Sequence, residues 1–297
     1  MKLSHDAGAE RLLIVYNPIA GRRRRRFLSR VLEALERRGL SVRLEPTKKR
    51  GDAEALARGA RESGADRLVV AGGDGTINEA LNGLEGPVPP LAIVPLGTAN
   101  VLAHELGLGR RADAVAAAIA EGHSRVVTLG VVNGRRFSMM AGVGFDAHVV
   151  RDVDSKLKRA IGKGAYAIET LRQLLVFGPR FYDVTVDGAK HRAASVIVCN
   201  GHYYGGKFVA APQARLDAPE FQAVLFGRAG RWATLRYAVA LAFNRLSKLG
   251  DVTILPARTV EIAGPAGEPV QADGDIVAYL PARFDAIPDA ARLVGPA

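Results

Sequence analysis

Apolar runs of strand length alternate with helical patterns over the first 128 residues. The runs at 11–16, 67–71 and 91–94 are almost wholly apolar, and each is followed by a turn that contains glycine. Between them apolar side chains recur three or four positions apart, as at 27–35, which is typical of a helix with one buried face. Continuous apolar strands separated by helices predict a parallel sheet that helices cover on both faces. We therefore expect an α/β domain over residues 1–128.

The pattern changes beyond residue 128. Short segments of strand character follow one another, and Asp187-Gly188 is a typical two-residue hairpin turn. This predicts a mostly antiparallel β-sandwich domain over residues 129–287, with 288–297 a candidate to pack back on the first domain. Helical patterns at 158–176 and 232–249 interrupt the strands. We expect the apolar residues of the second helix to be buried in the core rather than in contact with a membrane, because apolar helical faces usually are.

Charge and cysteine content narrow the class of protein. Lys and Arg number 41 against 30 Asp and Glu, a net charge of +11, and residues 1–64 alone hold 16 basic and 8 acidic residues. Such a surplus predicts contact with polyanions: nucleotide phosphates, anionic lipid headgroups or nucleic acid. The single cysteine, Cys199, excludes an intramolecular disulfide. The first apolar run is too short for a signal peptide, and no run reaches the ~18 residues of a membrane span. We expect a cytoplasmic protein.

The strongest chemical signal is Gly72-Gly-Asp-Gly-Thr-Ile-Asn-Glu79 at a strand-to-helix turn. Glycines let the backbone approach a polyphosphate, and the helix that follows offers its N–H groups and dipole to the anion. Asp74 would repel phosphate unless a cation lay between them, which indicates Mg²⁺. The alternative is a tight turn with Thr76 as helix cap. The spacing fits neither the dinucleotide G-x-G-x-x-G motif nor the Walker A loop.

A second loop, Pro95-Leu-Gly-Thr-Ala-Asn100, follows the next apolar run. Neighbouring parallel strands end side by side, so Thr98 and Asn100 could donate hydrogen bonds to the same phosphates. Capping of the following helix by Thr98 is the alternative.

Four motifs occur in order along the chain: Asn17-Pro18-x-x-Gly21, Gly72–Glu79, Gly97-Thr98-x-Asn100 and Asp273-Gly274-Asp275. Their order and spacing resemble the diacylglycerol kinase catalytic-domain family, which includes bacterial lipid kinases and the sphingosine and ceramide kinases. The resemblance implies an α/β nucleotide domain and a C-terminal β-sandwich with the active site in the cleft between them. It also implies ATP as phosphate donor and a hydroxyl of a membrane lipid, diacylglycerol-like or sphingoid- or ceramide-like, as acceptor.

The resemblance assigns roles to single residues. Asn17 and Thr47 correspond to adenosine-side contacts, and Asp275 stands where the family has the glutamate that takes the acceptor proton. Asp273, two residues away, is the other candidate base, while a plain hairpin turn is the alternative for both. Asp146 resembles a residue of the lipid headgroup pocket, unless it is a surface residue that ends a strand. The phosphate side corresponds to Gly73, Asp74, Gly75, Thr76, Asn78 and Glu79, with Thr98 as a further contact.

Three positions depart from the family pattern. Many diacylglycerol-type members have aspartate where this chain has Val101, and some have it where Thr128 stands. The usual Leu-Asp-Asp-Gly element, which holds a structural Mg²⁺ in the family, contains Ala218 in place of its second aspartate, so we do not predict that metal site. Sphingoid-type members also lack the first aspartate, which leaves the acceptor lipid open.

The partners follow from charge. Arg22–Arg26 could bind phosphates or the anionic inner face of the membrane, with which we expect transient association, or it could be a solvated helix start. No nucleic acid is expected, because no basic platform with aromatic residues accompanies the run. A homodimer is left open. Two other functions remain: an NAD kinase-type phosphotransferase, and a catalytically weak lipid- or nucleotide-binding protein.

Overall fold

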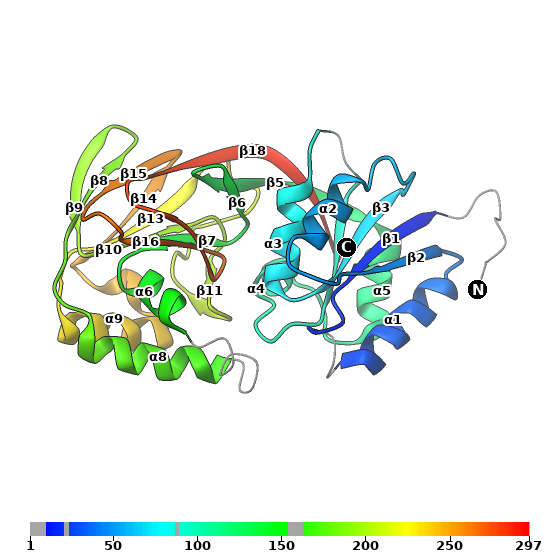
Figure 1. Ribbon diagram of the computed structural model, residues 1–297, viewed down its shortest axis with the longest axis horizontal. Helices are drawn as coiled ribbons and strands as arrows, with labels where there is room; N and C mark the ends of the chain where they lie inside the picture. The colour runs from blue at the N-terminus through cyan, green and yellow to red at the C-terminus, as the bar shows by residue number, and fades with distance from the viewer. Residues whose placement is uncertain (1–9, 21–23, 87–88, 154–162, 297) are drawn as a thin grey trace. The chain divides into compact units, whose positions relative to one another are not determined.

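The computed structural model describes residues 10–20, 24–86, 89–153 and 163–296. The chain divides into two compact units (Figure 1). Each unit has its own hydrophobic core. The first unit contains the chain up to Val126 together with the segment from Ala291, and the second runs from Val127 to Ala290. Within the described ranges, no helix has both the length and the apolar content that crossing a bilayer requires.

A parallel sheet forms the centre of the first unit. Strand β1 (Arg11–Tyr16) pairs in parallel with β2 (Ser41–Pro46) and β3 (Arg67–Gly72), and β3 pairs with β4 (Leu91–Pro95). The last strand, β18 (Ala282–Gly295), joins the β4 edge through the parallel pair Leu293–Leu91. The α/β fold and the parallel sheet expected from the apolar runs are thereby confirmed.

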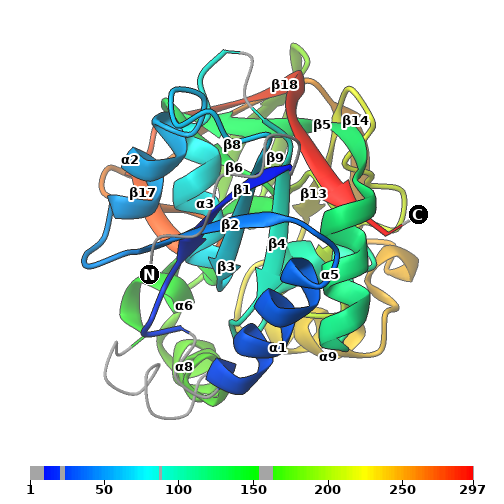
Figure 2. The same ribbon diagram turned by 90° about the vertical axis from the view of Figure 1, so that its right-hand side faces the viewer.

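Helices cover both faces of this sheet (Figure 2). Helices α1 (Arg25–Glu36) and α5 (Ala112–Glu121) share a core with β1, β3 and β4. Side chains of a strand alternate between its faces, and the other set of buried strand residues lies towards α2 (Asp52–Arg58) and α3 (Asp74–Gly83). Helix α4 (Val101–Glu105) follows β4. Because β1 to β4 are parallel neighbours, the loops that follow their carboxyl ends lie together at one end of the sheet.

The second unit is an antiparallel β-sandwich, as the sequence predicts. One sheet has the strand order β14-β13-β10-β7-β16-β17. Strands β8, β9 and β15 with the first part of β18 form the other side, and β5 and β6 pair beside them. The two sides meet in a core that includes Phe137, Tyr182, Phe221 and Phe284.

The bounds of these strands are β5 His123–Val132, β6 Arg135–Phe137, β7 Met140–Val143, β8 Tyr182–Val186, β9 Ala189–Ala193, β10 Ser195–Cys199, β13 Phe221–Phe226, β14 Val252–Ala257, β15 Thr259–Ala263, β16 Pro269–Ala272 and β17 Asp275–Tyr279. Strands β11 (Tyr203–Tyr204) and β12 (Phe208–Val209) form a separate hairpin. The turn between β8 and β9 confirms the hairpin predicted at Asp187-Gly188, because both residues have positive φ, 45° and 86°.

The described residues of the second unit include the helices α6 (Phe145–Asp152), α8 (Lys163–Val176) and α9 (Arg231–Ala242). The start of the helix expected at 158–176 falls outside the described residues, which resume at 163. The helix expected to run to residue 249 ends at Ala242, because Asn244 adopts a left-handed φ of 53° and a 3₁₀ turn at Leu246–Lys248 follows.

The expected burial of the apolar residues at 232–249 is wrong for most of them, although Leu246 is buried. Trp232, Leu235, Val239 and Phe243 are exposed, and only Tyr237 and Ala240 of α9 are buried. The second-unit core is filled by strand side chains and needs only one face of the helix.

Candidate active site

Backbone contact joins the two loops that the sequence assigned to phosphate. Gly72 lies opposite Pro95 in the parallel register, and the Leu96 N–H donates to the Gly72 carbonyl at 2.9 Å. A Cβ at Gly97 would lie only 2.6 Å from the Cα of Gly73. Position 97 therefore needs glycine for the loops after β3 and β4 to touch, whereas a Cβ at Gly73 would only be crowded, 3.2 Å from the Cα of Gly97. The expected proximity of these loops is confirmed.

Asp74 fastens the second loop to the first. Its two carboxylate oxygens accept the backbone N–H groups of Asn100, at 2.8 Å, and of Val101, at 2.6 Å. Asn100 has a left-handed φ of 48° and donates through Nδ2 to the Gly97 carbonyl at 2.9 Å. The carboxylate thus caps the start of α4. It retains capacity for a cation, because an ionised carboxylate has about four lone-pair sites.

The loop after β1 is tied to the glycine-rich loop by Asn17. The Asn17 Nδ2 donates to the Thr76 hydroxyl at 2.9 Å, and its Oδ1 accepts the N–H groups of Ile19 and Ala20. Glu79 ties the loop after β2 to α3, because its carboxylate accepts the Gly51 N–H at 3.0 Å. That loop begins at Thr47, whose N–H donates to the Tyr16 carbonyl.

The remaining predicted residues of this edge differ in exposure. Thr98 is exposed in the second loop, and Gly75 is exposed in the first turn of α3. The Asn78 side chain turns along α3, where its Oδ1 accepts a hydrogen bond from Asn82 at 3.2 Å. Asn78 therefore contacts the next turn of α3, while Thr98 and Gly75 lie at the strand ends where the two loops meet.

One arginine of the basic run reaches this edge. The Arg24 guanidinium donates to the Pro95 carbonyl at 3.1 Å, at the end of β4. Arg22 and Arg23 lie outside the described residues, while Arg25 and Arg26 are exposed in the first turn of α1. Cations at a helix N-terminus oppose the helix dipole, so an anion beside them would be favourable. The composition of the run gave no means of choosing Arg24 among five arginines.

Asp273 is engaged with the backbone of the second unit. Its carboxylate accepts the N–H groups of Ser138, Met139 and Met140 and the Ser138 hydroxyl, at 2.6 to 3.1 Å. Asp273 also has a positive φ of 47°. This carboxylate fixes the turn after β16 against the strand β7. Asp275, two residues on, begins β17 and is half-buried.

Gln271 connects this turn to Asp146. Its Oε1 accepts the Gly274 N–H at 3.1 Å, and its Nε2 donates to the Asp146 carboxylate at 3.0 Å. Asp146 is buried in the first turn of α6, so the reading as a surface residue is wrong. Burial raises its pKa to about 6, although the Gln271 hydrogen bond acts in the opposite direction. Sequence reasoning missed Gln271, whose neutral side chain gave no chemical signal.

A second buried network also escaped sequence reasoning. Glu268 accepts hydrogen bonds from Arg180 at 2.6 Å and from the Tyr182 hydroxyl at 2.7 Å. His148 Nε2 lies 2.9 Å from the Glu268 carboxylate. Burial acts to raise the pKa of Glu268, but His148, Tyr182 and the Arg180 charge outweigh it and leave this pKa below its ordinary value. Because His148 is two residues beyond Asp146, the network helps to fix α6.

The residues at two departures from the family pattern contact each other. The Thr128 hydroxyl donates to the Ala218 carbonyl at 2.6 Å, and the Thr128 N–H donates to the Leu216 carbonyl. Asp217 is paired with Arg215 at 2.8 Å. These residues do not fit a structural metal. No group of three or more His, Cys, Asp or Glu suited to a metal occurs in the part of the chain that the structure describes.

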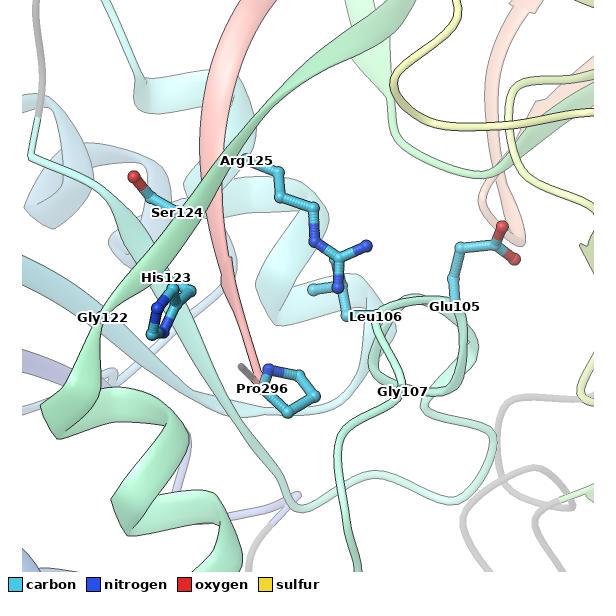
Figure 3. A pocket seen from close by; sticks show the side chains of 8 residues that line it. All are labelled: Glu105, Leu106, Gly107, Gly122, His123, Ser124, Arg125 and Pro296. Atoms are coloured by element: carbon cyan, nitrogen blue, oxygen red, sulfur yellow. The ribbon is translucent and has the colours of Figure 1, made fainter.

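An open pocket of the first unit lies apart from these loops (Figure 3). Its walls come from the end of α4, the start of β5 and Pro296, with Glu105, His123 and Arg125 among the side chains. It shares no residue with the candidate site, and we assign it no role.

Comparisons with known proteins cover nearly the whole chain. Residues 11–132 match the family model of the diacylglycerol kinase catalytic domain, and residues 139–295 match that of the YegS C-terminal NAD kinase beta sandwich-like domain. The chain is 31% identical over 285 residues to a diacylglycerol kinase of Bacillus subtilis strain 168, covering 93% of both chains. It is 32% identical to one of Staphylococcus carnosus strain TM300, covering 93% of this chain and 92% of that protein.

A solved structure shows the same fold. The crystal structure of a diacylglycerol kinase from Bacillus anthracis strain Sterne superimposes with a TM-score of 0.79 at 24% identity, covering 98% of each chain. The similarity therefore extends over both units.

Replacing Gly97 should destabilise the first unit. In Gly97→Ala the new Cβ meets backbone at 2.6 Å, so the loops must separate, and we expect a loss of roughly 1–3 kcal/mol. Gly75→Ala is the matched control, because its Cβ would meet nothing within 4 Å, and it should stay within about 0.5 kcal/mol. Urea-dependent hydrogen exchange of the β3 and β4 amides measures both. Equal protection in the two variants would contradict the contact.

Asp146 should make stability depend on pH. Its carboxyl keeps its proton in the folded state up to about pH 6, while the unfolded chain loses it near pH 4, so folded protein loses stability as pH rises between these values. Relative to Asp146→Asn, the wild type should lose about 2 kcal/mol between pH 4 and pH 7. Urea unfolding of both proteins at the two pH values tests this. A difference that does not change with pH would show that folding does not raise the pKa of Asp146.

Proposed function

Because the chain belongs to the diacylglycerol kinase family, a family of lipid kinases, we propose that it transfers the γ-phosphate of ATP to a hydroxyl of a membrane lipid. The observation that carries the proposal is the gathering of four loops at one edge of a parallel sheet, two of them in backbone contact at Gly73 and Gly97. Ligands of such sheets bind at this edge. Glycine positions that bring backbone N–H groups close together are suited to a polyphosphate.

The donor side is assigned to the first unit. Gly73, Gly75 and Thr76 would cradle the phosphates at the start of α3, whose dipole favours an anion. Arg24 adds a cation that the β4 carbonyl already orients. Asn17 and Thr47, at the ends of β1 and β2, would contact the adenosine side. Asn78, Glu79 and Thr98 complete this set.

Asp74 fits a nucleotide-bound Mg²⁺ through the chemistry of its carboxylate. Proteins often hold this ion with one or two carboxylates together with substrate phosphates, so a cluster of acidic residues is not required. When bound, the ion would neutralise charge on the transferred phosphoryl group. The hydrogen bonds to Asn100 and Val101 orient the carboxylate beforehand.

The acceptor side is assigned to the second unit, with Asp275 as the base that takes the hydroxyl proton. Asp273 is the weaker candidate because four donors already occupy its oxygens. We assign Asp273 the role of holding the turn that presents Asp275. Asp146 would contact the acceptor headgroup, and Gln271 connects it to the same turn.

Two other functions are set against this proposal. An NAD kinase-type activity would give the same glycine-rich loop, but the curated relatives described above are named diacylglycerol kinases. A catalytically weak binding protein is suggested by Val101, Thr128 and Ala218, where acidic residues of the family are absent.

Transfer of labelled phosphate tests the proposed activity. Protein with γ-labelled ATP and Mg²⁺ should label a lipid in a panel of diacylglycerol, monoacylglycerol, sphingoid base and ceramide, and should leave NAD unlabelled. Asp74→Asn is the inactive control, because an amide cannot accept both N–H groups and hold a cation. Labelled NAD would favour the second function. ATP binding without transfer to any lipid would favour the third.

Asp275→Asn should separate proton transfer from nucleotide binding. The amide keeps the size of the side chain but cannot take a proton, so turnover should fall by roughly 10²–10⁴-fold. Affinity for ATP should stay within about twofold, because the nucleotide residues lie on the first unit. Titration of ATP binding and initial rates on the preferred lipid measure the two effects.

The matched control is Asp275→Glu, which retains a carboxylate of the length found in the family and should retain activity. Asp273→Asn should instead lower stability, since an amide presents a donor to backbone N–H groups. Wild-type turnover in Asp275→Asn would remove this residue from the role of base.

A further inference from the structure

A row of exposed apolar side chains runs along α9 and ends at Phe243, the residue that follows the helix. Trp232 is 72% exposed, Leu235 38%, Val239 49% and Phe243 73%. These four positions are spaced three or four residues apart and therefore follow one stripe along a helix. We call them the α9 stripe.

The other face of α9 is apolar as well. Tyr237 and Ala240 are buried, and Tyr237 packs edge-on against Phe226 of β13 at 4.9 Å between ring centroids. A helix that is apolar on both faces is normally covered on both. Large exposed apolar side chains grouped on one element are typical of an interaction surface.

The hairpin β11–β12 extends the stripe beyond the end of the helix. The Val209 N–H donates to the Asn244 side chain at 2.8 Å, so the hairpin is fastened to the residue that follows Phe243. Phe208, beside Val209, is 44% exposed, and Lys207 before it is exposed. Helix α8 lies beside α9 at the same end of the second unit (Figure 1).

The surroundings of the stripe are cationic. Residues 221–250 contain five basic residues and no acidic residue. Arg231 and Arg236 fall on opposite sides of the stripe by helical spacing, and Arg236 is paired with Asp251. Among the described residues, no acidic side chain is paired with Arg231, Arg245 or Lys248. An occupant of this surface therefore has to supply an apolar interior and negative charge together.

We propose that the α9 stripe, with Phe208 and the flanking cations, docks on an anionic lipid bilayer. This inference rests on the proposed lipid kinase function, since it supplies the surface at which a membrane lipid is reached. Trp and Phe on one face and Arg or Lys beside them are the features of a helix that lies in the bilayer interface. A second copy of the chain fits less well, because isologous contact would bring arginines together without acidic partners.

Trp232 gives a direct readout, because it is the single tryptophan of the chain. Vesicles of phosphatidylcholine with phosphatidylglycerol should shift its emission to shorter wavelength, and brominated acyl chains should quench it. Pure phosphatidylcholine vesicles should bind at least about tenfold more weakly. Binding should also fall as salt rises, because the headgroup attraction is screened.

Variants identify the surface. The double variant V239S/F243Q, which keeps Trp232, should bind vesicles at least about tenfold more weakly in sedimentation, and R231Q/R245Q should lose the preference for anionic lipid. Phe181→Gln is the matched control, since Phe181 is 41% exposed on the same unit and lies outside the stripe, and it should bind like the wild type. Turnover of V239S/F243Q on a short-chain lipid below its micelle concentration should equal that of the wild type.

Three outcomes would overturn the docking surface: unchanged vesicle binding by V239S/F243Q, a Trp232 emission that anionic vesicles do not move, or a dimer in solution that V239S/F243Q dissociates. If V239S/F243Q still binds vesicles and R25Q/R26Q does not, the membrane-binding surface lies at the start of α1 and not on α9. The kinase proposal fails separately. If the protein is inactive but its Trp232 emission still responds to anionic vesicles, the docking surface stands and the kinase activity does not. If it phosphorylates a soluble lipid but its Trp232 emission does not respond to vesicles, the activity stands and the docking surface does not.

Discussion

Parallel strands that lie side by side must also end side by side, and the candidate nucleotide site depends on how closely the ends of β3 and β4 approach. Gly73 and Gly97 meet backbone to backbone, so side chains are excluded from the contact. Asp74 then holds the two loops together through the N–H groups of Asn100 and Val101. The geometry offered to a phosphate is therefore set by main-chain atoms and one carboxylate, which makes it independent of flexible side chains.

The second unit uses the same device. Asp273 accepts the N–H groups of three consecutive residues, 138–140, and so fixes a turn in a strained left-handed conformation. Asp187 accepts the N–H groups of Arg258 and Thr259 across the start of β15. Charge-assisted bonds of this kind are stronger than neutral ones, and each of them ties segments that are distant in sequence. Several aspartates in the motifs of this chain thus hold backbone segments together, a role that the motif alone does not reveal.

Hydrophobic periodicity and turn residues were sufficient to predict several strands and one hairpin from the sequence. Continuous apolar runs gave β1, β3 and β4, and Asp187-Gly188 gave its hairpin because both residues tolerate positive φ. Strand β14 contains Pro256, which is unfavourable within a strand, but β14 lies at a sheet edge where a missing donor is tolerated. Gln271 and the His148–Glu268 contact join residues 120 or more positions apart, which local pattern cannot show. The exposure of α9 depends on how much of the core the strands already fill, and this is a property of the whole unit.

The path of β18 has a consequence for how the protein is made. The segment from Ala291, which pairs with β4 in the first unit, follows the entire second unit in the chain. A ribosome therefore exposes the β4 edge of the first sheet until the second unit has been synthesised. An unpaired strand edge is a template for association with other chains, so the nascent first unit is open to mispairing during this interval. Dissecting the two units into separate polypeptides at residue 126 would make that temporary edge permanent.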